Sequence, residues 1–286
     1  MIGFNNLGNM GRLGNQMFEY ASLRGIAANK GYEWCIPPFH KKGIENYSLD
    51  RAFTLPSAQD KNLLVLDQGH APVVAERQYH FDKELFELCP DNVSLNGFFQ
   101  TEKYFKNIEG EIRKEFTFHD DIMEPCQEMI NSLDSAPIFL HIRRGDPNLT
   151  DPRGFKWSYT ECSDQHPPQP LEYYEKALRA FPEDQPVIVF SDSVDWVKEQ
   201  EIFQPDRFMI SEPIDKYDDG SFTPYADLCL MSLCSHAIIA NSSMSWWGAW
   251  LQSDPDKMVF APKMWFGPDY KDKDTKDLYY PGWHLL

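Results

Sequence analysis

The chain has 286 residues, which is enough for one large or two medium-sized domains. Its 27 lysines and arginines stand against 44 aspartates and glutamates, and the resulting net charge of −17 disfavours a broad surface for nucleic acid or anionic membrane. Any anion-binding site must therefore be local and built from a few cations.

Two features of the sequence indicate the compartment. The chain has no run of 18 apolar residues, and its first residues, Met-Ile-Gly-Phe-Asn-Asn-Leu-Gly, lack the basic and apolar regions of a signal peptide. The six cysteines form no Cys-x-x-Cys pair, which favours reduced thiols over a disulfide framework or a zinc site. We expect a soluble, cytoplasmic protein.

The N-terminal half predicts few regular elements. Residues 15–30 resemble a helix that ends at Gly31, and residues 33–36 resemble a strand that ends at two prolines. Between residues 41 and 134 the pattern indicates only mixed α/β structure. We expect a first α/β domain over residues 1–135 and a second over residues 136–286, because regular alternation starts there.

In the second domain, strand-like and helix-like segments alternate, which predicts a parallel sheet with right-handed crossovers. Residues 147–170 interrupt this alternation with five prolines and predict an irregular loop, a kind of segment that is often functional. The predicted strands are 137–142, 187–190, 208–210, 237–240 and 259–261, and the predicted helices are 171–181, 191–203, 225–236 and 246–251.

The first of these strands ends in a conspicuous polar group. Residues 137–146 read Pro-Ile-Phe-Leu-His-Ile-Arg-Arg-Gly-Asp, and ligands of open α/β sheets bind beyond the carboxyl ends of the strands. Arg143 and Arg144 would emerge there with planar guanidinium donors that match phosphate oxygens. The alternative is an exposed arginine pair that forms salt bridges with Asp146.

A second polar segment reads Asn-Ser-Ser-Met-Ser at residues 241–245, between a predicted strand and a predicted helix. Backbone amides at a helix N-terminus and the hydroxyls of Ser242, Ser243 and Ser245 could hold an anion. Simple helix capping by the same serines is the alternative. The following Trp-Trp-Gly-Ala-Trp run, residues 246–250, predicts packed core rather than a sugar platform.

Two more segments complete the candidate sites. Asp192 follows the strand 187–190 and could either accept donors from a guanine or ribose or cap the next helix. Residues 11–16, Gly-Arg-Leu-Gly-Asn-Gln, supply glycines and amides just before a helix. They lack the P-loop and the Gly-x-Gly-x-x-Gly patterns, which argues against an ATPase or a dehydrogenase.

The sequence does not favour metal or serine-hydrolase chemistry. Asp-x-Asp occurs at residues 254–256 and 272–274, but a chain this acidic produces such triplets readily, and we interpret both as solvated surface. No histidine pair has His-x-x-x-His spacing, and no Gly-x-Ser-x-Gly is present. We expect no bound metal.

Five blocks occur together in one order along the chain. They are Gly-Asn-Gln-Met-Phe-Glu-Tyr-Ala at 14–21, His-Ile-Arg-Arg-Gly-Asp at 141–146, Tyr-Tyr-Glu-Lys-Ala at 173–177, Phe-Ser-Asp at 190–192, and the stretch 227–251 that contains Asn-Ser-Ser-Met-Ser-Trp-Trp-Gly-Ala-Trp-Leu. This combination resembles the α-1,2-fucosyltransferases, glycosyltransferase family 11. The resemblance runs from residue 11 to about residue 266 and covers most of the chain.

The resemblance implies an α/β, GT-B-like fold with two facing Rossmann-like domains, the C-terminal one binding GDP-fucose and the N-terminal one on the acceptor side. It implies inverting, metal-independent transfer of L-fucose from GDP-fucose to the 2-hydroxyl of a terminal β-galactoside, with no cofactor. A lipid-linked glycan acceptor would bring the protein to the inner face of the membrane as a peripheral protein.

The resemblance also implies residue roles. Arg143 would bind the diphosphate, and Arg144 would hold the loop geometry or share the charge. His141 and Asp192 would address the ribose or guanine, and the three serines would line the phosphate or ribose side. The full set expected at the donor is His141, Arg143, Arg144, Asp192, Asn241, Ser242, Ser243, Ser245, Gly14, Asn15 and Gln16.

A general base is expected on the opposite face of the sugar, because the acceptor hydroxyl sheds its proton late. Asp146 is the first candidate, Asp151 and Glu19 are alternatives, and a base could be absent; Asp146 could also only brace an arginine. The sequence departs from the family at residues 1–10, where the usual apolar first strand is replaced, at Glu19 instead of Gln, and at Met244 instead of Phe.

Three other functions fit parts of the sequence. A fucosyltransferase of another linkage, α-1,6 or peptide-O, would share the arginine block and the glycine segment. A glycan-binding module would use exposed tryptophans and need no GDP. A metal-dependent glycosyltransferase would use Asp-x-Asp and lose activity in EDTA.

Overall fold

The computed structural model describes residues 1–39, 47–150, 156–158, 160, 163–212 and 224–286. These residues form two compact units. Unit 1 comprises Met1–His119 and Lys273–Tyr280, and unit 2 comprises Asp120–Asp272 and Pro281–Leu286. None of the helices in the described residues is long and apolar enough to cross a membrane.

Unit 1 is built on a four-stranded parallel sheet of order β2-β1-β4-β3, with strands β1 (Ile2–Gly3), β2 (Trp34–Cys35), β3 (Val73–Ala75) and β4 (Ser94–Asn96). Its long helix α1 (Leu13–Lys30) ends at Gly31, which adopts φ +66° as the sequence predicts for a glycine at this position. The shorter helices of the unit are α2 (Leu49–Ala52), α3 (Lys83–Leu88) and α4 (Glu109–Glu115).

Unit 2 is built on a six-stranded parallel sheet of order β12-β11-β10-β5-β8-β9. Its strands are β5 (Ile138–Ile142), β8 (Val187–Ser191), β9 (Phe208–Ile210), β10 (His236–Ile238), β11 (Val259–Ala261) and β12 (His284–Leu285). Its helices are α5 (Asp120–Asn131), α6 (Leu171–Leu178), α7 (Val194–Lys198), α8 (Tyr225–Leu233) and α9 (Ser243–Leu251). The two parallel sheets confirm the predicted α/β class.

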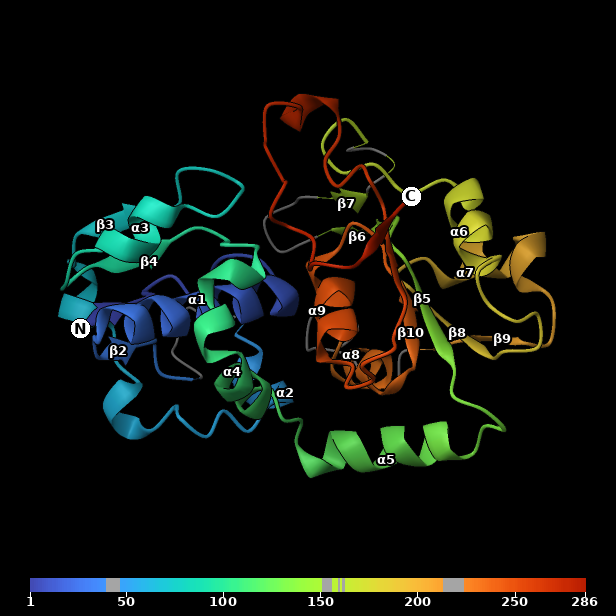
Figure 1. The fold of residues 1–286 in the computed structure, drawn as a ribbon, viewed down its shortest axis with the longest axis horizontal. Coiled ribbons are helices and arrows are strands. Elements are labelled where there is room, and N and C mark those ends of the chain that lie inside the picture. Colours follow the sequence, from blue (N-terminus) through green and yellow to red (C-terminus); the bar gives the residue numbers. More distant parts are fainter. Residues whose placement is uncertain (40–46, 151–155, 159, 161–162, 213–223) are drawn as a thin grey trace. The chain divides into compact units, whose positions relative to one another are not determined.

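The strand order of unit 2 reverses between β5 and β10. From β5 the chain adds β8 and β9 on one side, and then returns to add β10 and β11 on the other. Accordingly, α6 and α7 cover one face of the sheet, and α8 and α9 cover the opposite face (Figure 1). In open α/β sheets this reversal marks the crevice where ligands bind.

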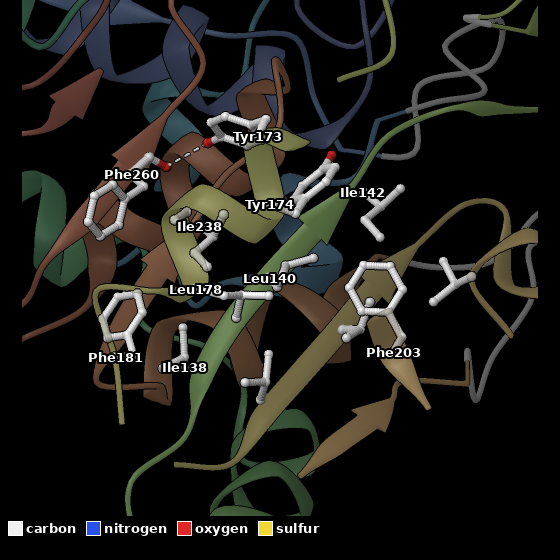
Figure 2. Packing of buried hydrophobic residues seen from close by; sticks show 14 residues of the cluster. Ile138, Leu140, Ile142, Tyr173, Tyr174, Leu178, Phe181, Phe203, Ile238 and Phe260 are labelled. Carbon is white, nitrogen blue, oxygen red and sulfur yellow. Dashed lines mark hydrogen bonds between the residues drawn. The ribbon is translucent and has the colours of Figure 1, made fainter. Parts of the chain in front are cut away.

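The packing of unit 2 explains why its continuous apolar runs form strands. Ile138, Leu140 and Ile142 of β5 pack with α6 in one buried cluster (Figure 2). Phe139 lies between them in the strand and is also fully buried. Strand residues alternate between faces, so a strand covered on both sides needs a continuous apolar run. Each such side chain contributes about 2 kcal/mol by burial.

The tryptophans of α9 lie in the packed core, as the sequence predicts. Trp246 and Trp247 have no exposed surface and Trp250 is 2% exposed. The three rings stack edge to face in sequence, with centroids 5.0 Å and 5.1 Å apart. They are therefore not a platform for sugar.

Two segments differ from the sequence prediction. The division between the units falls at His119 rather than at residue 135, because α5 packs on α8 and Cys126 Sγ donates to the carbonyl of Ala226. Part of the stretch expected to be irregular, residues 147–170, pairs as antiparallel strands β6 (Gly145–Thr150) and β7 (Lys156–Ser158).

Candidate active site

The polar segments of unit 2 meet at one edge of its sheet. In β5 and β8 the register pairs Ile142 with Ser191, and in β5 and β10 it pairs Leu140 with Ile238. The residues that follow these three strands therefore gather at the same carboxyl edge, beside the reversal of strand order. This is the place where the fold predicts a ligand.

The turn after β5, residues 143–145, is held by Asp192 after β8; we call it the arginine turn. Asp192 Oδ2 lies 2.5 Å from Arg143 Nη1 and accepts the backbone N–H of Gly145 at 2.8 Å. Its Oδ1 accepts the backbone N–H of Arg144 at 2.9 Å. The turn contains Gly145 at φ +76°, a conformation that favours glycine.

These contacts give Asp192 a defined place in the structure. Its carboxylate braces the arginine turn, and the next residue, Ser193, donates its hydroxyl to the carbonyl of Gly145 at 2.8 Å. Ser191 Oγ in turn accepts the backbone N–H of Ser193. A direct contact of Asp192 with ribose or guanine stays a prediction.

Arg144 has a different partner from Arg143. Its guanidinium carbon lies 3.9 Å from the ring centroid of Trp196 in α7, so the cation stacks on the indole face. Partial burial lowers the pKa of Arg144, which nevertheless stays charged because guanidinium titrates far above neutral pH. The two adjacent arginines are thus held separately.

His141, the fourth residue of β5, is buried at the same edge. Its Nδ1 has no hydrogen-bond partner among the described residues. Burial lowers the pKa of His141 to about 4, Asp192 opposes this shift and Arg143 reinforces it. The imidazole is therefore neutral at pH 7 and has a buried nitrogen available to a ligand or a water.

The segment after β10 presents hydroxyls at the start of α9. Ser242 occupies the N-cap position, but in the described structure its side chain makes no capping hydrogen bond. Ser242 and Ser243 are half-buried, whereas Ser245 is fully buried and its hydroxyl donates to the carbonyl of Ser242 at 3.3 Å. The N-terminus of α9 can therefore offer amides and two hydroxyls to an anion.

Asn241 organises loops beside this helix. Its Nδ2 donates to the carbonyls of Pro167 and Trp265, each at 3.1 Å. Gln169 reinforces the same junction by donating to the carbonyl of Met264 at 3.2 Å. The Asn241 side chain is 3% exposed, and its carbonyl oxygen has no hydrogen-bond partner within the described residues.

The glycine segment lies in unit 1, at the start of α1. Gln16 is fully buried and its Oε1 accepts the backbone N–H of Ser48 at 3.0 Å, while Asn15 Oδ1 accepts from Gln100 Nε2 at 2.8 Å. Gly14 is also buried. Because these residues and the arginine turn belong to different units, their joint action on one ligand stays a prediction.

Of the three candidate general bases, the structure describes the side chain of Glu19 alone. Asp151 and the side chain of Asp146 lie outside the part that the structure describes. Glu19 of α1 has no exposed surface, and neither carboxyl oxygen has a hydrogen-bond partner among the described residues. Burial, aided by the nearby Glu76, raises the pKa of Glu19 well above its usual value.

Sequence reasoning missed three residues around the arginine turn. Ser193 and Trp196 contact it directly, and the hydroxyl of Tyr174 in α6 is completely buried with no hydrogen-bond partner in the described structure. Arg144 lowers the pKa of Tyr174 against a larger upward effect of burial, so the two groups are electrostatic neighbours. Tyr173-Tyr174 stood in a motif, but no sequence signal marked Trp196.

The Asp-x-Asp triplets show ordinary surface contacts. Asp254 accepts the backbone N–H of Asp256, and Asp274 pairs with Lys276 at 3.0 Å. Among the described residues no group of three or more His, Cys, Asp or Glu could hold a metal ion.

The architecture can now be compared with solved structures. The fold is similar to fucosyltransferase NodZ from Bradyrhizobium, with a TM-score of 0.54 at 14% identity over 90% of this chain and 94% of that one. It is equally similar to POFUT1 in complex with GDP, with a TM-score of 0.54 at 13% identity over 91% and 97% of the two chains. The protein therefore has a GT-B-like fold of the kind seen in fucosyltransferases.

The family is shown by sequence. The model of Glycosyl transferase family 11 matches residues 1–286, so the chain belongs to this family of glycosyltransferases. The resemblance found in the sequence motifs is confirmed.

Curated relatives cover nearly the whole chain. The Escherichia coli O-antigen biosynthesis glycosyltransferase WbnK is 28% identical over 93% of this chain and 96% of its own length. An α-1,2-colitosyltransferase of Escherichia coli is 29% identical over 90% of both. The rabbit (Oryctolagus cuniculus) galactoside α-(1,2)-fucosyltransferase 2 is 27% identical over 91% of this chain and 74% of its own length.

Proposed function

We propose that the protein transfers L-fucose from GDP-fucose to the 2-hydroxyl of a terminal β-galactoside, with inversion and without a metal. The observation that carries this proposal is the arginine turn, because it places two fixed guanidinium groups at the strand-order reversal of unit 2. Such groups suit a diphosphate leaving group.

The names of the relatives support both the donor and the linkage. The rabbit relative is a galactoside α-(1,2)-fucosyltransferase, and the solved structures with the same fold include NodZ co-crystallised with GDP. The bacterial relatives include an enzyme that forms an α-1,2 linkage with a different sugar. Linkage therefore has broader support among the relatives than the identity of the transferred sugar.

The chemistry of this proposal needs charge stabilisation at the leaving group. As GDP departs, negative charge grows on its β-phosphate, while the fucose ring gains oxocarbenium character. Arg143 would neutralise that charge, and the amides and hydroxyls at the start of α9 would bind the remaining phosphate oxygens. Fixed cations then take the part that a divalent metal plays in other glycosyltransferases.

In this proposal unit 1 supplies residues near the transferred sugar, and the candidate bases come from both units. Asn15 and Gln16 would contact the transferred sugar, and Asp146 would take the proton of the attacking hydroxyl, with Asp151 and Glu19 as alternatives.

His141 is neutral at pH 7 and would hydrogen-bond the ribose or guanine rather than add charge. A lipid-linked glycan acceptor would bring the enzyme to the inner membrane face.

Transfer of colitose is a second candidate, because the α-1,2-colitosyltransferase is 29% identical over 90% of the chain. Colitose is fucose without its 3-hydroxyl. A site that hydrogen-bonds this hydroxyl rejects the deoxy sugar strongly, whereas a site that leaves it uncontacted accepts both. Comparing the activity with GDP-fucose and with GDP-colitose therefore distinguishes fucose transfer from colitose transfer.

The test is a transfer assay with GDP-fucose and GDP-colitose against lactose, N-acetyllactosamine and galactosyl-N-acetylgalactosamine. We expect fucose on the galactose 2-hydroxyl, identified by NMR of the product, and the same rate in EDTA. An α-1,6 or peptide-O product would contradict the proposed linkage. Loss of activity in EDTA would contradict the metal-independent mechanism, and glycan binding with no affinity for GDP in calorimetry would contradict the transferase.

A further inference from the structure

Trp196 lies between the packed core of unit 2 and the arginine turn, and none of the roles proposed above involves it. It belongs to the short helix α7 and is half-buried against the core cluster formed by β5, β8 and α6. Its indole face carries the guanidinium of Arg144 at 3.9 Å. Trp196 thus connects the packed core to the arginine turn.

Arg144 is fixed at both its backbone and its side chain. Asp192 accepts the backbone N–H of Arg144, and Trp196 stacks on its side chain. Both partners come from one segment of six residues, Ser191 to Trp196, in which Ser193 also holds the carbonyl of Gly145. One segment therefore restrains each residue of the arginine turn.

Stacking restricts a guanidinium without using its hydrogen bonds. The contact takes one face of the planar group, so the N–H edges stay available to other partners. The side chain of Arg143 is held by Asp192, which also accepts the backbone N–H of Arg144, so the two arginines share one restraint on the turn. A preorganised cation stabilises a transition state better than a mobile one because it needs no reorganisation during the reaction.

We propose that Trp196 is a positioning residue of the donor site, which anchors Arg144 by stacking so that the arginine turn presents Arg143 to the diphosphate. This inference rests on the proposed function and adds a residue to that site. Trp196 acts through Arg144 and makes no contact with substrate. Its loss therefore lowers kcat, because the β-phosphate carries more charge in the transition state than in the bound donor and a mobile cation stabilises that charge less well. Affinity for the product GDP falls less, because the guanine and the ribose of GDP also bind.

The experiment compares Trp196→Leu, which removes the aromatic face, with Trp196→Phe, which keeps a smaller one. For Trp196→Leu we expect kcat to fall about tenfold and the dissociation constant for GDP in calorimetry to rise by less than about threefold. Trp196→Phe should recover most of the lost kcat. Equal losses in the two variants, or an unchanged kcat in Trp196→Leu, would overturn the proposal.

A double-mutant cycle tests whether the effect passes through Arg144. With Arg144→Gln as the second change, Trp196→Leu should lower kcat no further, because the cation that it holds is gone. If the two losses in kcat multiply instead, Trp196 acts by another route and the proposal is wrong. The same cycle in urea unfolding detects the contact without any donor sugar.

Unit 2 supplies a matched control for the loss of a stacked arginine. Arg207 lies 4.9 Å from the ring centroid of Phe208, at the start of β9 and away from the arginine turn. Phe208→Leu should lower the unfolding midpoint in urea as Trp196→Leu does, but it should leave kcat unchanged. An equal loss of kcat in Phe208→Leu would show a general structural effect and overturn the proposal.

The outcomes separate this inference from the proposed function. A wild-type protein that does not bind GDP contradicts the proposed function, while the unfolding cycle still measures the coupling between Trp196 and Arg144. A wild-type protein that binds GDP and transfers fucose, with a fully active Trp196→Leu variant, contradicts the inference alone.

Discussion

Asp192 Oδ2 lies 2.5 Å from Nη1 of Arg143, and the same carboxylate accepts two backbone N–H groups of the turn that carries this arginine. One carboxylate at the end of β8 therefore fixes both the main chain and the side chain of the turn after β5. Because β5 and β8 are hydrogen-bonded neighbours, the sheet itself sets the distance between them. The cation is presented by the fold rather than by a flexible loop.

Replacing Arg143 tests the leaving-group role. Arg143→Lys keeps a positive charge but removes the planar fork of donors. We expect kcat to fall roughly 30- to 1000-fold, which corresponds to a loss of about 2–4 kcal/mol of transition-state stabilisation. Steady-state kinetics with GDP-fucose measure this loss. Arg207→Lys, an arginine of the same unit that donates to the carbonyl of Pro182, is the control and should keep full activity. A fully active Arg143→Lys enzyme is incompatible with the proposed role.

Replacing Asp192 tests whether its carboxylate holds the arginine turn in place. In Asp192→Asn an amide nitrogen takes the place of one oxygen, so at least one backbone N–H of the turn loses its acceptor. We expect a loss of about 1–3 kcal/mol in the free energy of unfolding, measured in urea, together with a lower kcat. The exposed Asp195 of α7 provides the control Asp195→Asn. A variant as stable and active as wild type would show that the turn keeps its geometry without this carboxylate.

Replacing Asp146 tests the general base. Asp146→Asn should abolish transfer and leave the affinity for GDP nearly unchanged, because a base acts on the acceptor hydroxyl and not on the nucleotide. Single-turnover kinetics and calorimetry separate the two effects. Asp184→Asn, at an exposed site of unit 2, is the matched control. Near-wild-type turnover would rule out this role and leave Asp151, Glu19 or no base.

Replacing Glu19 tests the buried acid of α1. Its pKa is raised in the folded protein, so between its ordinary value of 4.5 and the raised value the native state holds a proton that the unfolded state has lost. Stability should therefore fall as pH rises through this window. Glu19→Gln should flatten the dependence of the free energy of unfolding on pH between pH 5 and pH 8.

Urea unfolding at the two pH values measures this difference. Glu33→Gln, an exposed change in the same unit, should leave the pH dependence as in wild type. An equally steep dependence in Glu19→Gln would contradict a raised pKa of Glu19 in the native state.

The sequence predicted those elements that depend on local patterns. The strands of unit 2 were visible because they are covered on both faces, and their apolar runs end at polar or proline residues. In unit 1, β2 lies within the strand predicted over residues 33–36. The other strands of unit 1 and β12 have two or three residues each, too few for any periodicity. The boundary before α5 was missed because its packing partner α8 lies about a hundred residues later in the chain.

The sequence also predicted some residues of the candidate site and missed others. Arg143, Ser242 and Asp192 stood at predicted strand ends, so topology alone brought them to one edge. Trp196 carried no signal, since its stacking on Arg144 joins two residues about fifty positions apart in the sequence. Sequence thus predicts the charged groups better than it predicts the partners that hold them.

The central claim is that Arg143 neutralises the departing GDP, and a crystal structure of the protein with GDP tests it most directly. The account predicts the β-phosphate within hydrogen-bond distance of the Arg143 guanidinium, with the start of α9 on the other phosphate oxygens. A diphosphate bound elsewhere in the protein, with Arg143 paired to Asp192 and not in contact with the diphosphate, would contradict it.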